Sequence, residues 1–194
     1  LAELGFLGIC LPEEYGGSDA PLMDALIVIE ELAKVCRPAA FEVFEANVGP
    51  VRVLQFYGTA AQCEEIIPKV VAGQTSVGIG ISEPDAGSGA TDMRTSARLD
   101  GDEYVINGTK RWISGGGHAG HYLLYCRLND SPGSKAIGAI LVAADTPGLS
   151  FGAPEKLMGF RGIASADLIF EDARVPKENL VISAGGFKKL FGVF

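Results

Sequence analysis

The hydrophobic period of this 194-residue chain changes near Gly73-Gln74, and this change limits the possible folds more than any other feature. Up to Gly73, apolar residues recur at three- and four-residue steps, as they do along one face of a helix. From Gln74 to about Val181 no helical period is found, and short apolar runs alternate with turn signals. The sequence therefore predicts an α+β fold, with a helical N-terminal domain followed by an antiparallel β-barrel or sandwich.

Three helices are predicted in the first part. A helical stretch over 39–57, the second of them, should bend at Gly49-Pro50, because proline removes an amide donor and clashes with the preceding turn. Thr59-Ala60-Ala61-Gln62 has the spacing of a capping box and opens the third helix, which Gly73 can close. The first helix carries one apolar stripe, formed by Leu22, Leu26, Ile29, Leu32, Ala33 and Cys36.

The second part is punctuated by turn signals. Asp100-Gly101 and Asn107-Gly108 are dipeptides typical of tight turns, and they flank a short apolar run. The run Val77–Ile81 alternates bulky residues with glycine, at the length of a strand. Further strands are predicted over 103–106, 109–114, 122–127, 137–143 and 167–171.

Composition excludes several classes of function. The formal net charge of −8 argues against nucleic acid, which needs a concentrated basic surface. No apolar run approaches the roughly 20 residues of a membrane-spanning helix. The four cysteines are scattered without a CxxC pair, and only two histidines are present, so we expect no metal site. Cysteines among apolar neighbours indicate a reducing compartment.

Two glycine-rich segments carry the candidate chemistry. In Gly80–Ala90 a predicted strand ends in a long loop of small residues, which lets a flat ligand approach free backbone amides. In Gly108–Gly117 the single tryptophan, Trp112, stands two residues before Ser114, so a regular strand would turn both to one face. This suits a stacked heteroaromatic cofactor. The alternatives are a plain connection for the loop and a core position for the indole.

In their order and spacing these segments resemble the signature of the acyl-CoA dehydrogenase family. The matching motifs are a strand ending in Ser82-Glu83-Pro84 with Ala86-Gly87-Ser88, then Lys110-Arg111-Trp112-Ile113-Ser114, then Lys156–Arg161 and Phe170–Pro176. Pro12–Gly17 and Pro68–Gly73 also agree, so the resemblance covers essentially all of the chain.

The resemblance implies a helical N-terminal domain over 1–73, a middle β-barrel domain over 74–182 on the flavin and CoA side, and over 183–194 the start of a C-terminal four-helix bundle. The N-terminal domain is expected to be incomplete at its start and the bundle to be truncated. The resemblance also implies FAD between the middle domain and the bundle, and assembly as a dimer or a homotetramer.

Each role in the cofactor site is carried over residue by residue from the resemblance. Ser82 should hydrogen-bond the pyrimidine edge of the flavin, assisted by the backbone at Ile79 and Ile81, where donors stabilise charge as it develops. Trp112 should pack against the rings, with Ile113 beside it. Ser114 should donate toward N5.

The substrate site follows in the same way. Ser88 matches the position that contacts CoA, although Gly89 follows it where the family often has aspartate. Phe41, Glu45 and Val48 match positions that line the acyl pocket. A glutamate there is costly unless it is solvated or paired, so Glu45 indicates a short or polar acyl group, unless it lies on a solvated helix face.

The implied reaction is FAD-dependent α,β-dehydrogenation of an acyl-CoA thioester, in the degradation of fatty or organic acids. No residue of this chain matches the family's catalytic base, a glutamate of the bundle, and Glu83 is not expected to replace it. The implied electron acceptor is an electron-transfer flavoprotein or a similar protein, in the cytoplasm or, in a eukaryote, the mitochondrial matrix. The alternatives are an acyl-CoA oxidase, an enoyl-CoA reductase, or a non-catalytic acyl-CoA- or flavin-binding module.

Overall fold

The computed structural model describes residues 1–193, which divide into two compact units. The helical unit contains Leu1–Val77 and Leu157–Ile163, and the sheet unit contains Gly78–Lys156 and Ala164–Gly192. A helical region followed by a sheet confirms the predicted α+β fold class.

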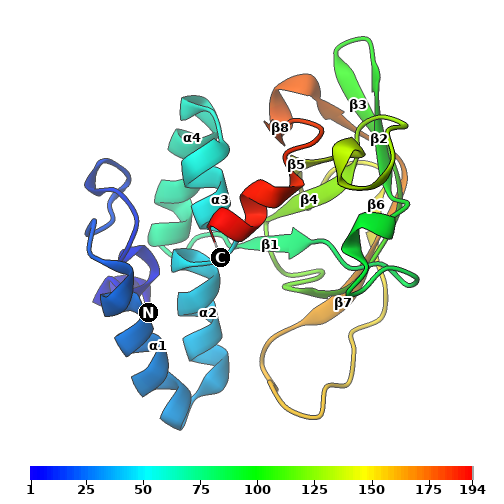
Figure 1. Cartoon of the computed structure of the whole chain (residues 1–194). Coiled ribbons are helices and arrows are strands. Elements are labelled where there is room, and N and C mark those ends of the chain that lie inside the picture. The colour runs from blue at the N-terminus through cyan, green and yellow to red at the C-terminus, as the bar shows by residue number, and fades with distance from the viewer. Residues whose placement is uncertain (194) are drawn as a thin grey trace. The chain divides into compact units, whose positions relative to one another are not determined.

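The helical unit consists of short 3-10 turns followed by four α-helices (Figure 1). The helical stretch predicted over 39–57, with a bend at Gly49-Pro50, is interrupted at that point and forms two helices. Gly49 leaves the helical conformation with ψ of −141°, and Pro50 starts a new helix at a position where no amide donor is needed. None of the helices in residues 1–193 combines the length and apolar character needed to cross a membrane. The α-helices are α1 (Leu22–Val35), α2 (Arg37–Asn47), α3 (Pro50–Tyr57) and α4 (Ala60–Val71).

The predicted apolar stripe of α1 is only partly correct. Ala25 is fully buried and joins the core cluster of Ile9, Cys10 and Val43, against which Ile29 and Leu32 pack. Leu22, Leu26 and Cys36 are instead exposed. The small side chain of Ala25 allows close packing, so the buried face follows Ala25 rather than the larger leucines.

The capping box of α4 is confirmed. The Gln62 amide donates to Thr59 Oγ1 over 3.2 Å, and the Thr59 amide donates to Gln62 Oε1 over 2.9 Å. Gly73, with φ of 68°, follows the helix in the left-handed conformation that favours glycine, as predicted.

The sheet unit contains an eight-stranded sheet in the order β6-β7-β3-β2-β4-β5-β8, with β1 paired to β4. Neighbours along this order are antiparallel, except that β2 and β4 share one parallel bridge. Within the described residues, β6 and β8 are not paired, so the series of strands stays open. The strands are β1 (Val77–Gly80), β2 (Ser96–Asp100), β3 (Glu103–Ser114), β4 (His121–Arg127), β5 (Ile137–Ala143), β6 (Leu149–Phe151), β7 (Ser165–Pro176) and β8 (Leu180–Ile182).

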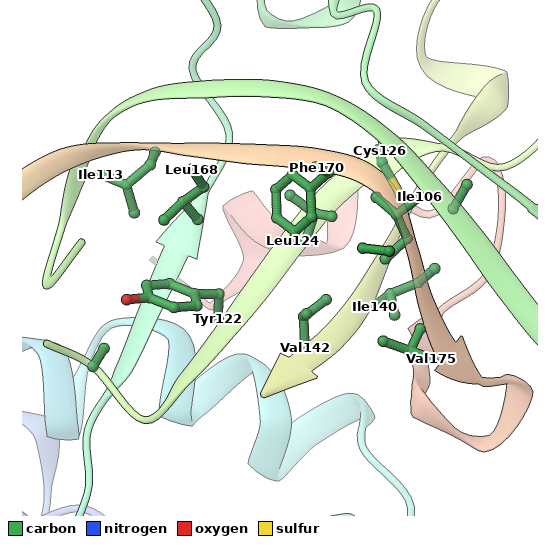
Figure 2. Packing of buried hydrophobic residues seen from close by; sticks show 13 residues of the cluster. Ile106, Ile113, Tyr122, Leu124, Cys126, Ile140, Val142, Leu168, Phe170 and Val175 are labelled. Carbon is green, nitrogen blue, oxygen red and sulfur yellow. The ribbon is translucent and has the colours of Figure 1, made fainter. Parts of the chain in front are cut away.

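Figure 2 shows how the sheet builds its core: side chains of β3 and β7 face those of β4 and β5. The labelled residues are all buried and lie in one cluster. They are Ile106, Ile113, Tyr122, Leu124, Cys126, Ile140, Val142, Leu168, Phe170 and Val175.

The predicted turn at Asn107-Gly108 is wrong, because β3 continues through it. The pairing passes from Ile106–Ala173 to Gly108–Phe170, so two steps on β3 match three on β7. The extra residue on β7 is a bulge, and the Asn107 side chain hydrogen-bonds the backbone and carboxylate of Asp172 there. By contrast, the predicted turn after Asp100 is confirmed: Gly101, with φ of 64°, lies between the paired residues Asp100 and Glu103.

The segment 183–194, expected to start a helical bundle, forms no α-helix within the described residues. Residues Phe187–Gly192 form a 3-10 helix, and Phe187 and Leu190 are buried. Phe187 contacts Tyr125 of β4 edge-on, with the ring centroids 5.7 Å apart. Phe194, at the end of this segment, lies outside the described residues.

We predict that Leu124→Ala lowers the free energy of unfolding by about 2–5 kcal/mol, because it opens a cavity among close-packed side chains. Leu99→Ala is the matched control, since Leu99 is a strand leucine of the same sheet with 57% of its surface exposed. We expect its effect to stay within about 0.5 kcal/mol. Urea unfolding of the two variants measures the difference, and equal losses would contradict the packing in Figure 2.

Candidate functional site

The two glycines of β1 bring the flavin-side segments together. A Cβ at Gly78 would lie 2.9 Å from the Ser114 carbonyl oxygen and 3.0 Å from the Tyr122 ring. A Cβ at Gly80 would lie 3.5 Å from Lys110 Cγ. The glycines therefore allow β1 to lie directly against the C-terminal end of β3, which explains the alternation of bulky residues with glycine.

A buried ion pair lies where β1 runs into its loop. Lys110 Nζ donates to Glu83 Oε1 over 2.8 Å and to the Ile81 carbonyl oxygen over 2.9 Å. The Lys110 side chain is 0% exposed and that of Glu83 is 6% exposed. The Glu83 carboxylate also accepts hydrogen bonds from the amides of Arg94 and Thr95.

These contacts fix the charge state of Glu83. Burial alone would raise its pKa, but the Lys110 ammonium and the two amide donors hold the pKa below its usual range. An ionised carboxylate with its donors in place is a poor proton acceptor. The expectation that Glu83 does not act as the base agrees with this environment.

Trp112 occupies a bulge in β3. The pairing passes from Lys110–Leu168 to Ile113–Ala166, so three steps on β3 match two on β7. The residue that adopts the unusual conformation is Trp112, with φ of 58°. Its side chain is 60% exposed, which excludes the alternative of an indole in the core. The argument from regular strand alternation, which paired Trp112 with Ser114, does not hold across this bulge.

The bulge is held by the neighbouring arginine. Arg111 Nη2 donates to Asp167 Oδ2 over 2.8 Å, and its Nε lies 3.2 Å from both carboxylate oxygens. The hydrogen bonds and charge of Arg111, together with the Trp112 amide, lower the pKa of Asp167. Arg111 is thus paired with Asp167, and Lys110 is paired with Glu83.

A backbone hydrogen bond brings the Ser82 loop next to the Trp112 bulge. The Arg111 amide donates to the Ser82 carbonyl oxygen over 2.8 Å, which brings the loop beside the bulge. Ser82 and Ser114 are both partly exposed, whereas the Ile113 side chain is buried in the core. Of Ile113, only the backbone could contact a ligand. Ser88 lies farther along the loop and is exposed.

The helical unit has an apolar cavity of about 320 Å³, within the range of small-molecule sites. Phe41 and Phe44 of α2 line it, and Phe160 meets Phe41 edge-on with ring centroids 5.1 Å apart. Arg37 is the charged residue at its wall. The remaining lining residues are Ile29, Ala33 and Ala40.

Glu45 lies elsewhere, against a smaller cavity of about 30 Å³ that Glu42, Val51 and Val70 also line. Its Oε2 is buried and has no hydrogen-bond partner among the described residues. Burial, together with the charge of Glu42, raises the pKa of Glu45 to about 8. The structure therefore does not bring Phe41 and Glu45 into one cavity, while Val48 is buried beyond the end of α2.

The sequence indicates the exposed residues of this site but not the ion pairs that lie beside them. In the sequence, Lys110 and Arg111 are identified only as part of a motif, and Asp167 only as a residue of a predicted strand. The pairs Lys110–Glu83 and Arg111–Asp167 join residues 27 and 56 positions apart. The available signal was a lysine on a predicted strand, since a lysine that the strand buries needs an acceptor.

Comparison with known proteins shows which family the chain resembles. A family model for the acyl-CoA dehydrogenase N-terminal domain matches residues 1–74, and one for the acyl-CoA dehydrogenase middle domain matches residues 78–173. The acryloyl-CoA reductase (NADH) of Anaerotignum propionicum is 40% identical over 191 residues, which are 97% of this chain and 48% of the relative. The mitochondrial isobutyryl-CoA dehydrogenase of Dictyostelium discoideum is 40% identical over 186 residues, 95% of this chain and 44% of the relative.

Solved structures show the same similarity. A glutaryl-CoA dehydrogenase from Mycobacterium smegmatis in complex with FADH2 superposes with a TM-score of 0.90 at 27% identity, over 99% of this chain and 48% of that one. The chain thus spans about half the length of the relatives it matches. The two family models together cover most of the sequence, and the chain belongs to the acyl-CoA dehydrogenase family.

Proposed function

We propose that this chain is the flavin- and CoA-side part of an FAD-dependent enzyme that dehydrogenates an acyl-CoA thioester between its α- and β-carbons. The observation that carries the proposal is the Trp112 bulge, which holds a largely exposed indole next to the Ser82 loop. A strained residue with an exposed aromatic side chain contributes little to folding and is typical of a ligand site.

The described residues fit a flat heteroaromatic cofactor. Trp112 offers an exposed aromatic surface. The partly exposed Ser82, in the loop after β1, and Ser114, at the end of β3, offer hydroxyl donors. The backbone at Ile79, Ile81 and Ile113 completes the proposed FAD site. We assign the proposed domains to 1–73, 74–182 and 183–194, with this site in the middle domain.

Bound FAD would accept the hydride that leaves the β-carbon of the acyl group. Ser82 would donate to the ring edge on which negative charge develops, and Ser114 would donate near the atom that is reduced. Trp112 would pack against the rings and exclude water from one side. We assign no catalytic base to this chain, because the only buried carboxylate of the site, Glu83, is held ionised by its donors.

The substrate would be an acyl-CoA, with Ser88 near the CoA moiety and Phe41 and Val48 on the acyl side. Phe41 faces an apolar cavity, which suits a hydrocarbon chain. Glu45 faces a separate cavity of about 30 Å³, so we do not place its carboxyl group against the acyl chain.

One alternative is supported by a specific observation: a relative at 40% identity is named an acryloyl-CoA reductase. An enoyl-CoA reductase would use the same flavin-side residues in the opposite direction, and an oxidase would pass the electrons to oxygen. A non-catalytic acyl-CoA- or flavin-binding module is a further alternative.

The proposed enzyme acts in the degradation of fatty or organic acids, in the cytoplasm or the mitochondrial matrix. It forms a homo-oligomer, a dimer or tetramer, and passes electrons to an electron-transfer flavoprotein or a similar acceptor.

The complete protein containing this chain should purify with a flavin absorbance band that bleaches when a saturated acyl-CoA is added without oxygen. Bleaching separates an enzyme from a binding module, and rapid reoxidation by oxygen would identify an oxidase. Oxidation of the reduced flavin by an enoyl-CoA, with no reduction by the saturated acyl-CoA, would favour the reductase. We expect the 194-residue chain alone to bind FAD weakly and to show no turnover with an artificial electron acceptor.

Ser114→Ala in the complete protein should leave the fold unchanged and slow flavin reduction. The loss of one preorganised donor typically raises the barrier by about 2–4 kcal/mol. Stopped-flow absorbance measures the reduction rate. Ser96→Ala, at a partly exposed strand position of the same sheet, is the control, and equal reduction rates in the two variants would remove Ser114 from the site.

Glu45→Gln should make this chain more stable than the wild type at neutral and higher pH. The raised pKa means that the folded chain favours the neutral carboxyl of Glu45. The contribution of this preference to the free energy of unfolding is complete below the unfolded pKa of about 4.3, and it is lost as the pH rises through the folded pKa. The advantage of the glutamine should therefore grow between about pH 4.3 and about pH 8. We expect it to reach about 1–3 kcal/mol, the usual cost of an unsatisfied buried polar group.

Urea unfolding at several pH values measures this difference. Glu64→Gln, an exposed position on α4, is the control and should give a difference that does not change with pH. A Glu45→Gln effect that is equally independent of pH would show that Glu45 is solvated in the folded chain.

A further inference from the structure

The proposed function does not explain why a lysine is enclosed within the sheet unit. Lys110 Nζ meets Glu83 Oε1, the Ile81 carbonyl oxygen and, at 3.7 Å, Met93 Sδ. Taking an ammonium and a carboxylate out of water is costly, and apolar replacement of a buried ion pair is often neutral or stabilising. Stability alone is therefore a weak reason for this pair, whereas fixing one particular geometry is a sufficient one.

The pair acts on both neighbours of Ser82. Lys110 holds the carbonyl of Ile81 before it and the carboxylate of Glu83 after it. The adjacent Arg111 amide holds the carbonyl of Ser82 itself. Three consecutive loop residues are thus fixed by two consecutive residues of β3, and the Ser82 hydroxyl is hydrogen-bonded to none of the described residues.

Glu83 extends the same connection to a third segment. Its Oε2 accepts from the Arg94 amide over 2.6 Å, and its Oε1 accepts from the Thr95 amide over 2.9 Å. Both carboxylate oxygens are therefore occupied, and the side chain cannot rotate without breaking at least two of these contacts. The carboxylate joins the start of the loop, the end of the loop and β3.

We propose that Lys110 and Glu83 are a positioning pair for the flavin-side loop: their buried contacts set the orientation of Ile81–Glu83 and thereby aim the hydrogen-bonding groups of Ser82 at the cofactor. The assignment rests on the proposed function. Neither side chain reaches the surface, so both act through Ser82 and do not themselves touch the cofactor.

Three variants of the complete protein test the proposal. Lys110→Met removes the ammonium and leaves Glu83 buried without its counter-charge. Lys110→Met/Glu83→Gln removes both charges and keeps the variant testable if the single change does not fold. Arg174→Met is the matched control, because Arg174 makes exposed ion pairs with Asp100 and Glu103 at the other end of β3.

Two readouts are measured on each variant. Amide hydrogen exchange of Arg94, Thr95 and Arg111 without FAD reports whether the loop is held, since these amides donate to Glu83 and Ser82. Titration with FAD then gives the dissociation constant and the absorption spectrum of the bound flavin. In both Lys110 variants we expect these amides to exchange about tenfold faster and FAD to bind about tenfold more weakly, because the loss of one charge-assisted hydrogen bond produces a change of this size. We also expect a shifted absorption spectrum of the bound flavin.

The double variant should melt within about 5 °C of the wild type, and Arg174→Met should match the wild type in both readouts. A folded double variant with unchanged exchange and FAD binding would overturn the proposal, and so would a double variant that fails to fold, which would assign the pair to stability. Wild-type protein that binds no FAD would contradict the proposed function alone. The exchange rates would still decide whether the pair holds the loop.

Discussion

The antiparallel ladder between β3 and β7 is the constraint on which both the sheet and the candidate site depend. Its two strands of 12 residues are interrupted twice, by an extra residue on β7 at Asp172 and an extra residue on β3 at Trp112. Side chains alternate along a strand, so an extra residue exchanges the inner and outer faces beyond it. For this reason Lys110 and Ile113, three positions apart, are both buried, while Trp112 between them is exposed.

The chemistry of the site follows from this exchange of faces. Placing Lys110 inside requires a buried acceptor, and Glu83 supplies it together with two backbone donors that complete the carboxylate. Turning Trp112 outward requires a left-handed backbone that a bulky residue adopts at a cost of order 1–3 kcal/mol. The Arg111–Asp167 contact lies at the same point of the strand. The exposed Trp112 thus lies beside one buried ion pair, Lys110–Glu83, and one half-buried ion pair, Arg111–Asp167.

The sequence contains enough information for the fold class, the capping box of α4 and the strand over 137–143, because each depends on local period or local hydrogen bonding. The sequence alone does not determine features that depend on how two distant segments pair. Asn107-Gly108 has the composition of a turn, yet β7 pairs across it and converts it into part of a bulged ladder. The exposed tryptophan was placed in the correct segment, but its outward direction depends on a register shift that only the partner strand reveals. The acyl-side residues show the same limit, since Phe41 and Glu45 share a helix but line different cavities.

The Glu83 contacts also determine how freely the loop between Glu83 and Arg94 can vary. Because one side chain ties residue 83 to residues 94 and 95, the intervening segment is a closed loop whose ends stay together whatever its tip contains. The entropic cost of lengthening such a loop grows only with the logarithm of its length, about 0.6 kcal/mol for each doubling. Residues Asp85 and Gly87–Gly89, which are exposed, can therefore be exchanged or extended without moving the base of the loop. In the proposed enzyme, the residues that recognise the outer part of the ligand would then be able to change while the base of the loop stays in place.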